Sequence, residues 1–311
     1  MPKPQVLLTR RIPSAALATL EASCDVDRND EGPLPPAALV ARLHGKDGVI
    51  CVLTDAMTRD VMASAPTLKV VSNIAVGYNN IDVGAAHELG IVVTNTPDVL
   101  TEATAELTWA LVLDVTRRIT EGDRLARRGD WKGWALDFML GTELRGKQLG
   151  VVGYGRIGRA VAARARAAGM LIAYWDPVFG GESITLDRLL STSDVVALHC
   201  PLTPETKHLI DQAALARMKR SAYLVNTSRG PVIDEAALAW ALKNRIISGA
   251  ALDVYEEEPK IHPDLMTLEN VVLCPHLGSA TTETRTAMAD LAVRNTIAVL
   301  SGQPAITPVE A

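Results

Sequence analysis

Three short polar segments in the second half of the chain each follow an apolar run, and they contain residue types that bind anions and move protons. They are residues 226–230 (Asn-Thr-Ser-Arg-Gly), 256–259 (Glu-Glu-Glu-Pro) and 274–278 (Cys-Pro-His-Leu-Gly). All three lie downstream of a glycine-rich turn at 153–158, Gly-Tyr-Gly-Arg-Ile-Gly. An arginine, a glutamate and a histidine therefore share the chain with a candidate dinucleotide cradle, and together they indicate a catalytic site.

Arg229 has the chemistry to bind a carboxylate or to polarise a ketone. It follows a predicted strand at 223–226, so its guanidinium would lie at the carboxyl edge of a sheet. Hydride transfer between a nicotinamide and a 2-oxo acid needs such a cation. The alternative is a surface arginine that precedes a turn glycine.

His276 is the candidate proton donor. It follows a predicted strand at 271–274 and is flanked by a proline and a glycine, which would direct its ring away from the strand end. Glu258 could orient the imidazole, because a neighbouring carboxylate favours the protonated ring and keeps a general acid available. The alternative is a structural histidine beside a solvated acidic loop at 256–258.

The glycine turn directly follows a predicted strand at 148–152 and opens a helix, where free amides and the helix dipole can hold a pyrophosphate. Alone, the pattern also fits a plain loop or a helix cap. The next predicted strand, 171–175, ends at Asp176, at the spacing where an acid accepts hydrogen bonds from an adenosine ribose. A 2'-phosphate would meet this carboxylate without a following arginine, so we expect NAD(H) to be preferred and NADP(H) to remain possible. Asp176 could also be a simple turn residue.

The elements that must position these residues alternate between short apolar runs and helical patterns, which predicts parallel sheets covered by helices. In the first half we predict strands at 6–9, 48–53, 68–73 and 91–94, and helices at 14–21, 58–63 and 83–89. A long helix at 102–127 then precedes strands at 148–152, 171–175, 195–199, 223–226, 249–253 and 271–274. A final helix at 281–300 would return the chain to the first domain.

The 311 residues exceed the usual size of a single core, so two domains are expected. The predicted fold is α/β, with two Rossmann-like, doubly wound parallel-sheet domains and a cleft between them. We assign residues 1–98 plus 283–311 to a discontinuous substrate-binding domain and residues 99–282 to an NAD-binding domain.

The composition limits the classes of partner that the chain is expected to bind. A net charge of -5 without a basic face or tail argues against nucleic acid and membrane surfaces, and leaves a small molecule as the expected ligand. The four cysteines are far apart and are expected to be reduced, buried thiols, and no histidine pair has metal-ligand spacing, so no metal is expected. The apolar run at 6–9 is too short for a signal peptide, and no run approaches the roughly 18 residues of a membrane helix, so we expect a soluble, cytoplasmic protein.

Taken together, the sequence resembles the D-isomer-specific 2-hydroxyacid dehydrogenase family, and within it the glyoxylate/hydroxypyruvate reductase branch. The resemblance covers nearly the whole chain and rests on six segments. They are residues 73–82 (Asn-Ile-Ala-Val-Gly-Tyr-Asn-Asn-Ile-Asp), 102–106 (Glu-Ala-Thr-Ala-Glu), the turn at 153–158, 224–230 (Leu-Val-Asn-Thr-Ser-Arg-Gly), 252–259 (Leu-Asp-Val-Tyr-Glu-Glu-Glu-Pro) and 275–281 (Pro-His-Leu-Gly-Ser-Ala-Thr).

This resemblance implies NAD(P)H-dependent reduction of glyoxylate or hydroxypyruvate to the D-2-hydroxy acid. It implies that Arg229 binds substrate, that Glu258 is the one of three glutamates that pairs with His276, and that His276 exchanges the proton. The implied substrate-binding residues are Leu53, Val76, Gly77, Arg229 and His276, with the amides near Val76 and Gly77 holding the substrate carboxylate. The implied cofactor-binding residues are Thr104, Gly153, Gly155, Arg156, Ile157, Gly158, Asp176, Cys200, Thr206, Thr227, Ser228, Asp253 and Gly278.

Departures from relatives bear on the choice of substrate and coenzyme. The chain ends at 311 without the regulatory extension of many phosphoglycerate-oxidising relatives, and it has glutamate where formate-oxidising relatives have glutamine. Several reductases of the branch prefer NADPH, whereas Asp176 favours NADH here. The alternatives are a dehydrogenase for another 2-oxo acid such as pyruvate and, more remotely, an NADH-sensing protein that resembles the family's transcriptional corepressors.

An aromatic segment suggests how the chain assembles. Trp131, Trp134 and Phe138 lie in a segment that belongs, in relatives, to a dimer arm that can reach a neighbouring active site. We therefore predict a homodimer in which these side chains limit substrate size. Ordinary packing under a loop is the alternative.

Overall fold

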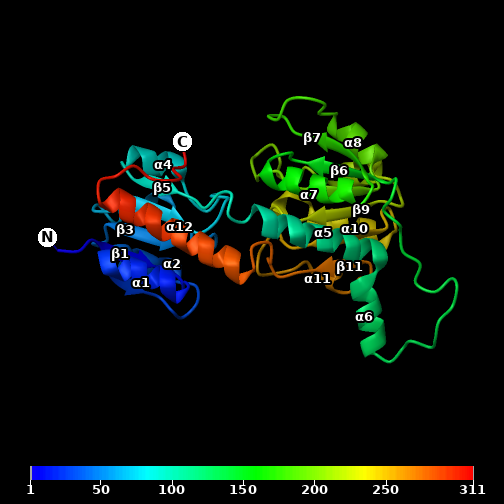
Figure 1. Ribbon diagram of the computed structural model, residues 1–311, viewed down its shortest axis with the longest axis horizontal. Coiled ribbons are helices and arrows are strands. Elements are labelled where there is room, and N and C mark those ends of the chain that lie inside the picture. The colour runs from blue at the N-terminus through cyan, green and yellow to red at the C-terminus, as the bar shows by residue number, and fades with distance from the viewer. Residues whose placement is uncertain (1, 311) are drawn as a thin grey trace. The chain divides into compact units, whose positions relative to one another are not determined.

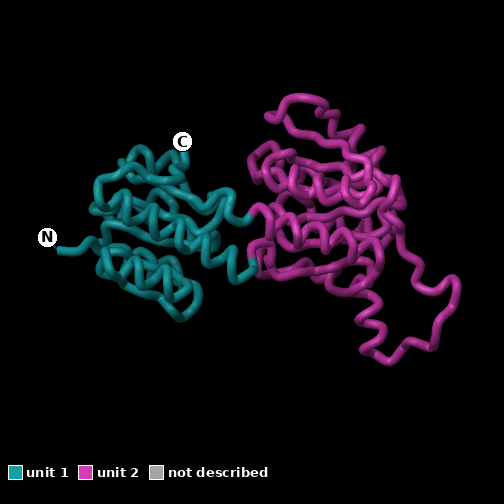
Figure 2. The backbone as a smooth tube through the Cα atoms, viewed as in Figure 1, with its two compact units in different colours: residues 1–100, 280–311 teal, residues 101–279 magenta. Residues whose placement is uncertain are grey.

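The computed structural model describes residues 2–310 and divides the chain into two compact units. Figure 2 shows the first unit, Met1–Leu100 with Ala280–Ala311, and the second, Thr101–Ser279. Each unit is a parallel sheet with helices packed on it. The predicted fold class, two α/β units with parallel sheets, is confirmed.

The first unit has a five-stranded sheet in the order β2-β1-β3-β4-β5. Alternate residues of β1 enter separate clusters, Leu7 in one and Val6 with Leu8 in the other, so both faces of this sheet are buried. Helix α12 returns to this unit and packs against α1, β3 and β4 (Figure 1). The elements are β1 Gln5–Leu8, α1 Ser14–Ser23, β2 Asp25–Arg28, α2 Pro36–Leu43, β3 Gly48–Cys51, α3 Arg59–Ala63, β4 Val70–Asn73, α4 Val83–Glu88, β5 Val92–Thr94 and α12 Thr282–Leu300.

Strand β2 and helix α2 were not among the predicted elements. Strand β2 lies at the edge of the sheet and is half exposed. Its sequence, Asp-Val-Asp-Arg, can therefore be polar, with a single apolar residue. Charged residues at an edge discourage pairing with another chain, and they also hide the apolar run by which a buried strand is found.

The second unit has a six-stranded sheet in the order β11-β10-β9-β8-β6-β7. Helices α5 and α7 lie side by side on one face of this sheet (Figure 1). The strand order reverses between β6 and β8, and α/β sheets bind ligands outside the carboxyl ends of strands at such a point. The elements are α5 Thr101–Arg117, α6 Ile119–Arg127, β6 Gln148–Val152, α7 Arg156–Ala167, β7 Leu171–Trp175, α8 Leu186–Thr192, β8 Val195–Leu198, α9 Gln212–Arg217, β9 Tyr223–Asn226, a 3-10 turn Gly230–Val232, α10 Glu235–Lys243, β10 Gly249–Leu252, α11 Pro263–Met266 and β11 Val271–Leu273.

The single helix predicted at 102–127 is wrong, because the structure has two helices there. Arg118 adopts a left-handed conformation, with φ of 57°, and interrupts the helical hydrogen bonding between α5 and α6. The carboxylate of Asp114 accepts hydrogen bonds from the backbone N–H and hydroxyl of Thr120, which stabilises the start of α6. Neither glycine nor proline marks this break in the sequence.

The four cysteines are free thiols, and Cys24, Cys51 and Cys200 are buried as predicted, whereas Cys274 is only half-buried. Among residues 2–310, no helix is both long enough and apolar enough to cross a bilayer.

Candidate active site

The carboxyl ends of three neighbouring parallel strands, β9, β10 and β11, carry the residues predicted to be catalytic. Arg229 follows β9, Glu258 lies in the loop after β10, and His276 follows β11. Because adjacent parallel strands end at one edge of a sheet, the three loops emerge side by side. All three residues belong to the second unit.

Glu258 and His276 form a hydrogen-bonded pair. Glu258 Oε2 lies 2.8 Å from His276 Nδ1, and Glu258 Oε1 accepts the Tyr255 backbone N–H at 3.1 Å. Burial alone would raise the pKa of Glu258, but the hydrogen bond and charge of His276 outweigh it and lower that pKa. Glu258 is therefore an ionised acceptor at neutral pH, and it leaves the second ring nitrogen of His276, Nε2, available for other partners.

The backbone around His276 is held by Asp253. His276 has a φ of 54°, an uncommon conformation for a residue with a Cβ atom. Its N–H donates to the Asp253 carbonyl at 2.9 Å, and the Asp253 carboxylate accepts the N–H groups of Leu277 at 2.6 Å and Gly278 at 2.8 Å. Burial raises the pKa of Asp253. Asp253 therefore supports the backbone around His276, in addition to its predicted contact with the cofactor.

Arg229 is held by the polar turn that follows β9. Asn226 Nδ2 donates to the Arg229 carbonyl at 2.9 Å, while Asn226 Oδ1 accepts from the backbone N–H and hydroxyl of Ser228. The guanidinium donates to the Ser228 carbonyl at 2.7 Å. Burial lowers the pKa of Arg229, and the charge of Glu258 opposes this. The next residue, Gly230, packs directly against the backbone of Tyr255 and Glu256, so Arg229 lies close to the loop that carries Glu258.

The glycine turn has the shape that a dinucleotide requires. Gly153 has a φ of 90°, and a Cβ atom there would overlap the backbone of His199 and Cys200 at the end of β8. A Cβ on Gly158 would overlap the Gly153 carbonyl, so α7 packs directly against the turn. At Gly155, the N-cap of α7, no atom of the described residues lies within 4 Å of a Cβ position. The start of α7 therefore borders open space at Gly155, as a turn that approaches a pyrophosphate requires.

Asp176 lies directly beyond β7, next to this turn. Its Oδ2 accepts the Tyr154 N–H at 2.7 Å, and its Oδ1 accepts the N–H groups of Val178 and Phe179, both at 2.8 Å. These backbone donors outweigh the effect of burial and lower the pKa of Asp176. The carboxylate is thus ionised and fixed beside the glycine turn.

The other predicted cofactor residues are also in the second unit. Thr104 donates to the Gly278 carbonyl at 3.2 Å, and the hydroxyls of Thr108 and Thr227 lie 2.8 Å apart, so α5 is tied to the loops after β9 and β11. Arg156 and Ile157 begin α7. Cys200 follows β8 and is buried, and Thr206 lies in the same loop and donates to the Pro201 carbonyl at 2.7 Å.

The remaining predicted substrate residues lie in the first unit. Leu53 follows β3, and Val76 and Gly77 follow β4, so they occupy the carboxyl edge of that sheet. The side-chain amides of Asn95 and Asn73 donate to the carbonyls of Val76 at 2.8 Å and Gly77 at 3.0 Å. The Asn95 bond fixes the peptide plane that carries the Gly77 N–H, and the Ala75 carbonyl, which shares its plane with the Val76 N–H, accepts the Thr96 N–H at 2.9 Å.

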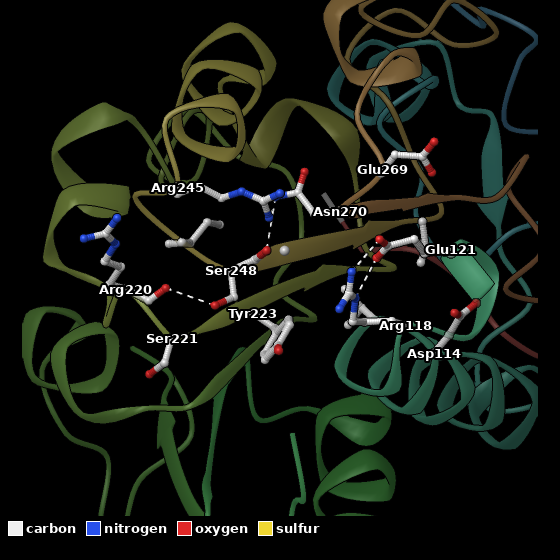
Figure 3. Close-up of a pocket in the computed structure, with 14 residues that line it drawn as sticks. Asp114, Arg118, Glu121, Arg220, Ser221, Tyr223, Arg245, Ser248, Glu269 and Asn270 are labelled. Carbon is white, nitrogen blue, oxygen red and sulfur yellow. Dashed lines mark hydrogen bonds and ion pairs between the residues drawn. The ribbon is translucent and has the colours of Figure 1, made fainter. Parts of the chain in front are cut away.

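A pocket of about 670 Å³ lies at the amino ends of strands in the second sheet, away from the carboxyl ends described above (Figure 3). It is lined by residues at the starts of β9, β10 and β11 and by the junction of α5 and α6. Arg118 pairs with Glu121 there, at 2.6 Å, and Arg220 and Arg245 are exposed. The predicted catalytic residues follow the other ends of these strands, so this pocket is not their site.

Sequence reasoning missed a polar network that joins the loop after β10 to the start of α10 and to His208. It comprises Glu235 at the start of α10, Glu256 in the loop after β10, and His208, whose Nε2 lies 2.5 Å from Glu256 Oε1. In the sequence, Glu235 directly follows the N-cap Asp234, and an acidic residue there is typical of an ordinary helix start. The sequence therefore gives no sign of this network.

The chain is similar to known proteins over nearly its whole length. A family model described as the D-isomer specific 2-hydroxyacid dehydrogenase, NAD binding domain, matches residues 109–278. A glyoxylate reductase of Thermofilum pendens is 47% identical, over 97% of this chain and 93% of its own. A crystal structure from Thermus thermophilus has a TM-score of 0.93 with 45% identity, covering 98% of this chain and 100% of that one. An NADPH-dependent glyoxylate/hydroxypyruvate reductase of Sinorhizobium meliloti, in complex with NADP and malonate, has a TM-score of 0.88 and 35% identity, covering 99% and 97%.

Proposed function

The chain belongs to the D-isomer-specific 2-hydroxyacid dehydrogenase family and is an NAD(P)-dependent oxidoreductase, and we propose that it reduces glyoxylate and hydroxypyruvate to their D-series 2-hydroxy acids. The observation that carries this proposal is the Glu258–His276 hydrogen bond at the carboxyl ends of adjacent parallel strands, where Arg229 follows the neighbouring strand β9. The glyoxylate reductases among the relatives support the choice of substrate.

The proposed reaction gives each of these side chains a separate task. Arg229 binds the carboxylate or the ketone oxygen of the 2-oxo acid and offsets negative charge that develops on that oxygen. His276 donates a proton from Nε2 to the oxygen, because its Nδ1 faces Glu258 Oε2 at 2.8 Å. Glu258 stabilises the imidazolium that this role requires.

The proposed coenzyme site is the turn at 153–158 with Asp176. A bound nicotinamide coenzyme supplies the hydride for the carbonyl carbon. The open space and the positive end of the dipole at the start of α7 suit its pyrophosphate, and the ionised Asp176 suits the two hydroxyls of an adenosine ribose. A 2'-phosphate would be repelled by this carboxylate, so we propose NADH as the preferred coenzyme although an S. meliloti relative is NADPH-dependent.

We also propose that the backbone N–H groups of Val76 and Gly77 bind the substrate carboxylate. The carbonyl in the peptide plane of each N–H accepts a hydrogen bond, Ala75 from the Thr96 N–H and Val76 from the Asn95 side chain, which gives these planes the rigidity that anion binding needs. Leu53, at the same edge of that sheet, would contact the substrate as an apolar neighbour.

A spectrophotometric panel tests the function directly. The panel follows oxidation of NADH and of NADPH with glyoxylate, hydroxypyruvate, pyruvate and phenylpyruvate. We expect the highest kcat/KM with NADH and either glyoxylate or hydroxypyruvate. A preference for pyruvate would retain the chemistry and reject the substrate, and no turnover of any 2-oxo acid would reject the function.

For assembly, we propose a homodimer built on the segment 128–143, here called the arm. The ends of the arm are tied to the pocket of Figure 3, because Arg128 pairs with Glu269 at 3.1 Å and the hydroxyls of Thr142 and Tyr223 lie 3.0 Å apart. Between these ends, large apolar side chains are exposed to an extent unusual for a monomer. They are Trp131, Trp134, Leu136, Phe138 and Leu140.

Light scattering after gel filtration tests the assembly, with a dimer expected for the wild type and a monomer for Leu136→Asp. A monomeric wild type would reject the proposal. The proposed limit on substrate size is separate. If Trp134→Ala showed the same relative kcat/KM for glyoxylate and phenylpyruvate as the wild type, the arm would have no role in specificity.

A further inference from the structure

One buried carboxylate holds the loop that carries Glu258. Glu235, the first residue of α10, is only 5% exposed, and its Oε1 accepts the Glu256 backbone N–H at 2.6 Å. This donor lies two residues before Glu258 in the sequence, so Glu235 anchors the start of the loop that carries Glu258.

Glu256 returns the interaction. Its Oε2 accepts the Glu235 N–H at 3.1 Å, which satisfies a backbone donor at the start of α10 that has no partner inside the helix. Its Oε1 lies 2.5 Å from His208 Nε2, and the His208 N–H donates to the Pro231 carbonyl at 2.8 Å. The network therefore continues from the Glu258 loop to the segment that follows Arg229.

The two catalytic segments are also in direct backbone contact. A Cβ atom on Gly230 would overlap the Tyr255 carbonyl and the Glu256 nitrogen, so the residue after Arg229 packs against the loop of Glu258 without space between them. A shift in either segment would be transmitted to the other, because closely packed interiors transmit strain.

We propose that Glu235, Glu256 and His208 form a latch that positions Glu258 and Arg229 relative to each other. The three are positioning residues, since they act through Glu258 and Arg229. This inference rests on the proposed reductase function. Burying a carboxylate is costly even when it is hydrogen-bonded, and an apolar pair could fill the same volume at lower cost, so stability alone explains Glu235 poorly.

Glu256→Ala tests the latch, with Glu257→Ala as the matched control on the same loop. Glu257 is exposed, and its side chain pairs only with Lys260, at 3.6 Å, among the described residues. We expect Glu256→Ala to lower kcat about tenfold with unchanged NADH affinity, because small displacements of catalytic groups have large effects on rate. Glu257→Ala should match the wild type, and Glu256→Gln should recover most of the activity, since its amide can accept from Glu235 and pair with His208.

A double-mutant cycle separates positioning from general stability. If Glu256 acts through Glu258, the tenfold effect of Glu256→Ala should shrink to less than about twofold in a Glu258→Gln background. Equal effects in both backgrounds, or a Glu256→Ala variant as active as Glu257→Ala, would overturn the latch. If Glu256→Ala fails to fold, Glu235→Ala replaces it, because it removes the acceptor of the Glu256 N–H, and an unchanged kcat would be equally decisive. A wild type that reduces no 2-oxo acid would instead reject the function.

Discussion

Three consecutive glutamates, Glu256, Glu257 and Glu258, have three different environments. Glu258 contacts His276 at 2.8 Å, Glu256 contacts His208 and the start of α10, and Glu257 is exposed to solvent. The residue type is the same, so position alone decides which carboxylate is available for chemistry. The residues by themselves suggested Glu258 as a possible partner of His276, and the family resemblance then chose it over Glu256 and Glu257.

The charge of Asp176 should set the coenzyme preference. We expect Asp176→Ala to reduce the ratio of kcat/KM for NADH to that for NADPH by about tenfold, because a carboxylate repels a 2'-phosphate and binds ribose hydroxyls. Asp176 also accepts three backbone N–H groups. Asp176→Asn is therefore the control, because it removes the charge and keeps an acceptor. An unchanged ratio in both variants would contradict the assignment of Asp176.

At the scale of elements, the turn between β6 and α7 offers a test that separates folding from binding. Gly155→Ala places a methyl group in open space, so we expect unchanged thermal stability and an NADH dissociation constant raised at least about tenfold. Gly158→Ala places it on the Gly153 carbonyl, and overpacking of this kind costs roughly 1–3 kcal/mol of stability. Melting temperature and NADH fluorescence titration measure both effects. Normal NADH binding by Gly155→Ala would contradict the proposed cradle.

The sequence predicted the strands of the second sheet to within a residue at each end, because buried parallel strands are short, nearly continuous apolar runs. It failed where that signal is absent. Strand β2 is polar and lies at an edge of its sheet. The break at Arg118 depends on a left-handed backbone conformation, which the residue type arginine does not indicate. The network of Glu235, Glu256 and His208 joins segments far apart in the chain, and no local pattern predicts such contacts.

At the scale of the whole molecule, the chain leaves its first unit after residue 100 and returns to it at 280. Each sheet is buried on both faces, which places titratable groups close to apolar surroundings. His199, which follows β8, is the clearest case. Its Nε2 has no hydrogen-bond partner among the described residues, and burial lowers the pKa of His199 to about 4 from 6.5.

This histidine should make folding sensitive to acid. In the unfolded chain His199 takes up a proton below about pH 6.5, whereas in the folded protein it does so only near pH 4. Stability therefore falls as the pH is lowered through this range. At pH 5 the loss due to His199 is up to about 2 kcal/mol. Urea unfolding at pH 7 and pH 5 should show a smaller acid-dependent loss for His199→Leu than for the wild type. Equal losses in the two proteins would disprove the assignment.

The central claim is that the half-buried guanidinium of Arg229 binds the 2-oxo acid beside the Glu258–His276 pair. The most direct test is kcat/KM for glyoxylate with NADH in Arg229→Ala and in the wild type. We expect a loss of about 10³-fold with NADH affinity retained, as for the removal of a group that stabilises charge in the transition state. A variant with the wild-type kcat/KM on glyoxylate and every other 2-oxo acid would contradict the account.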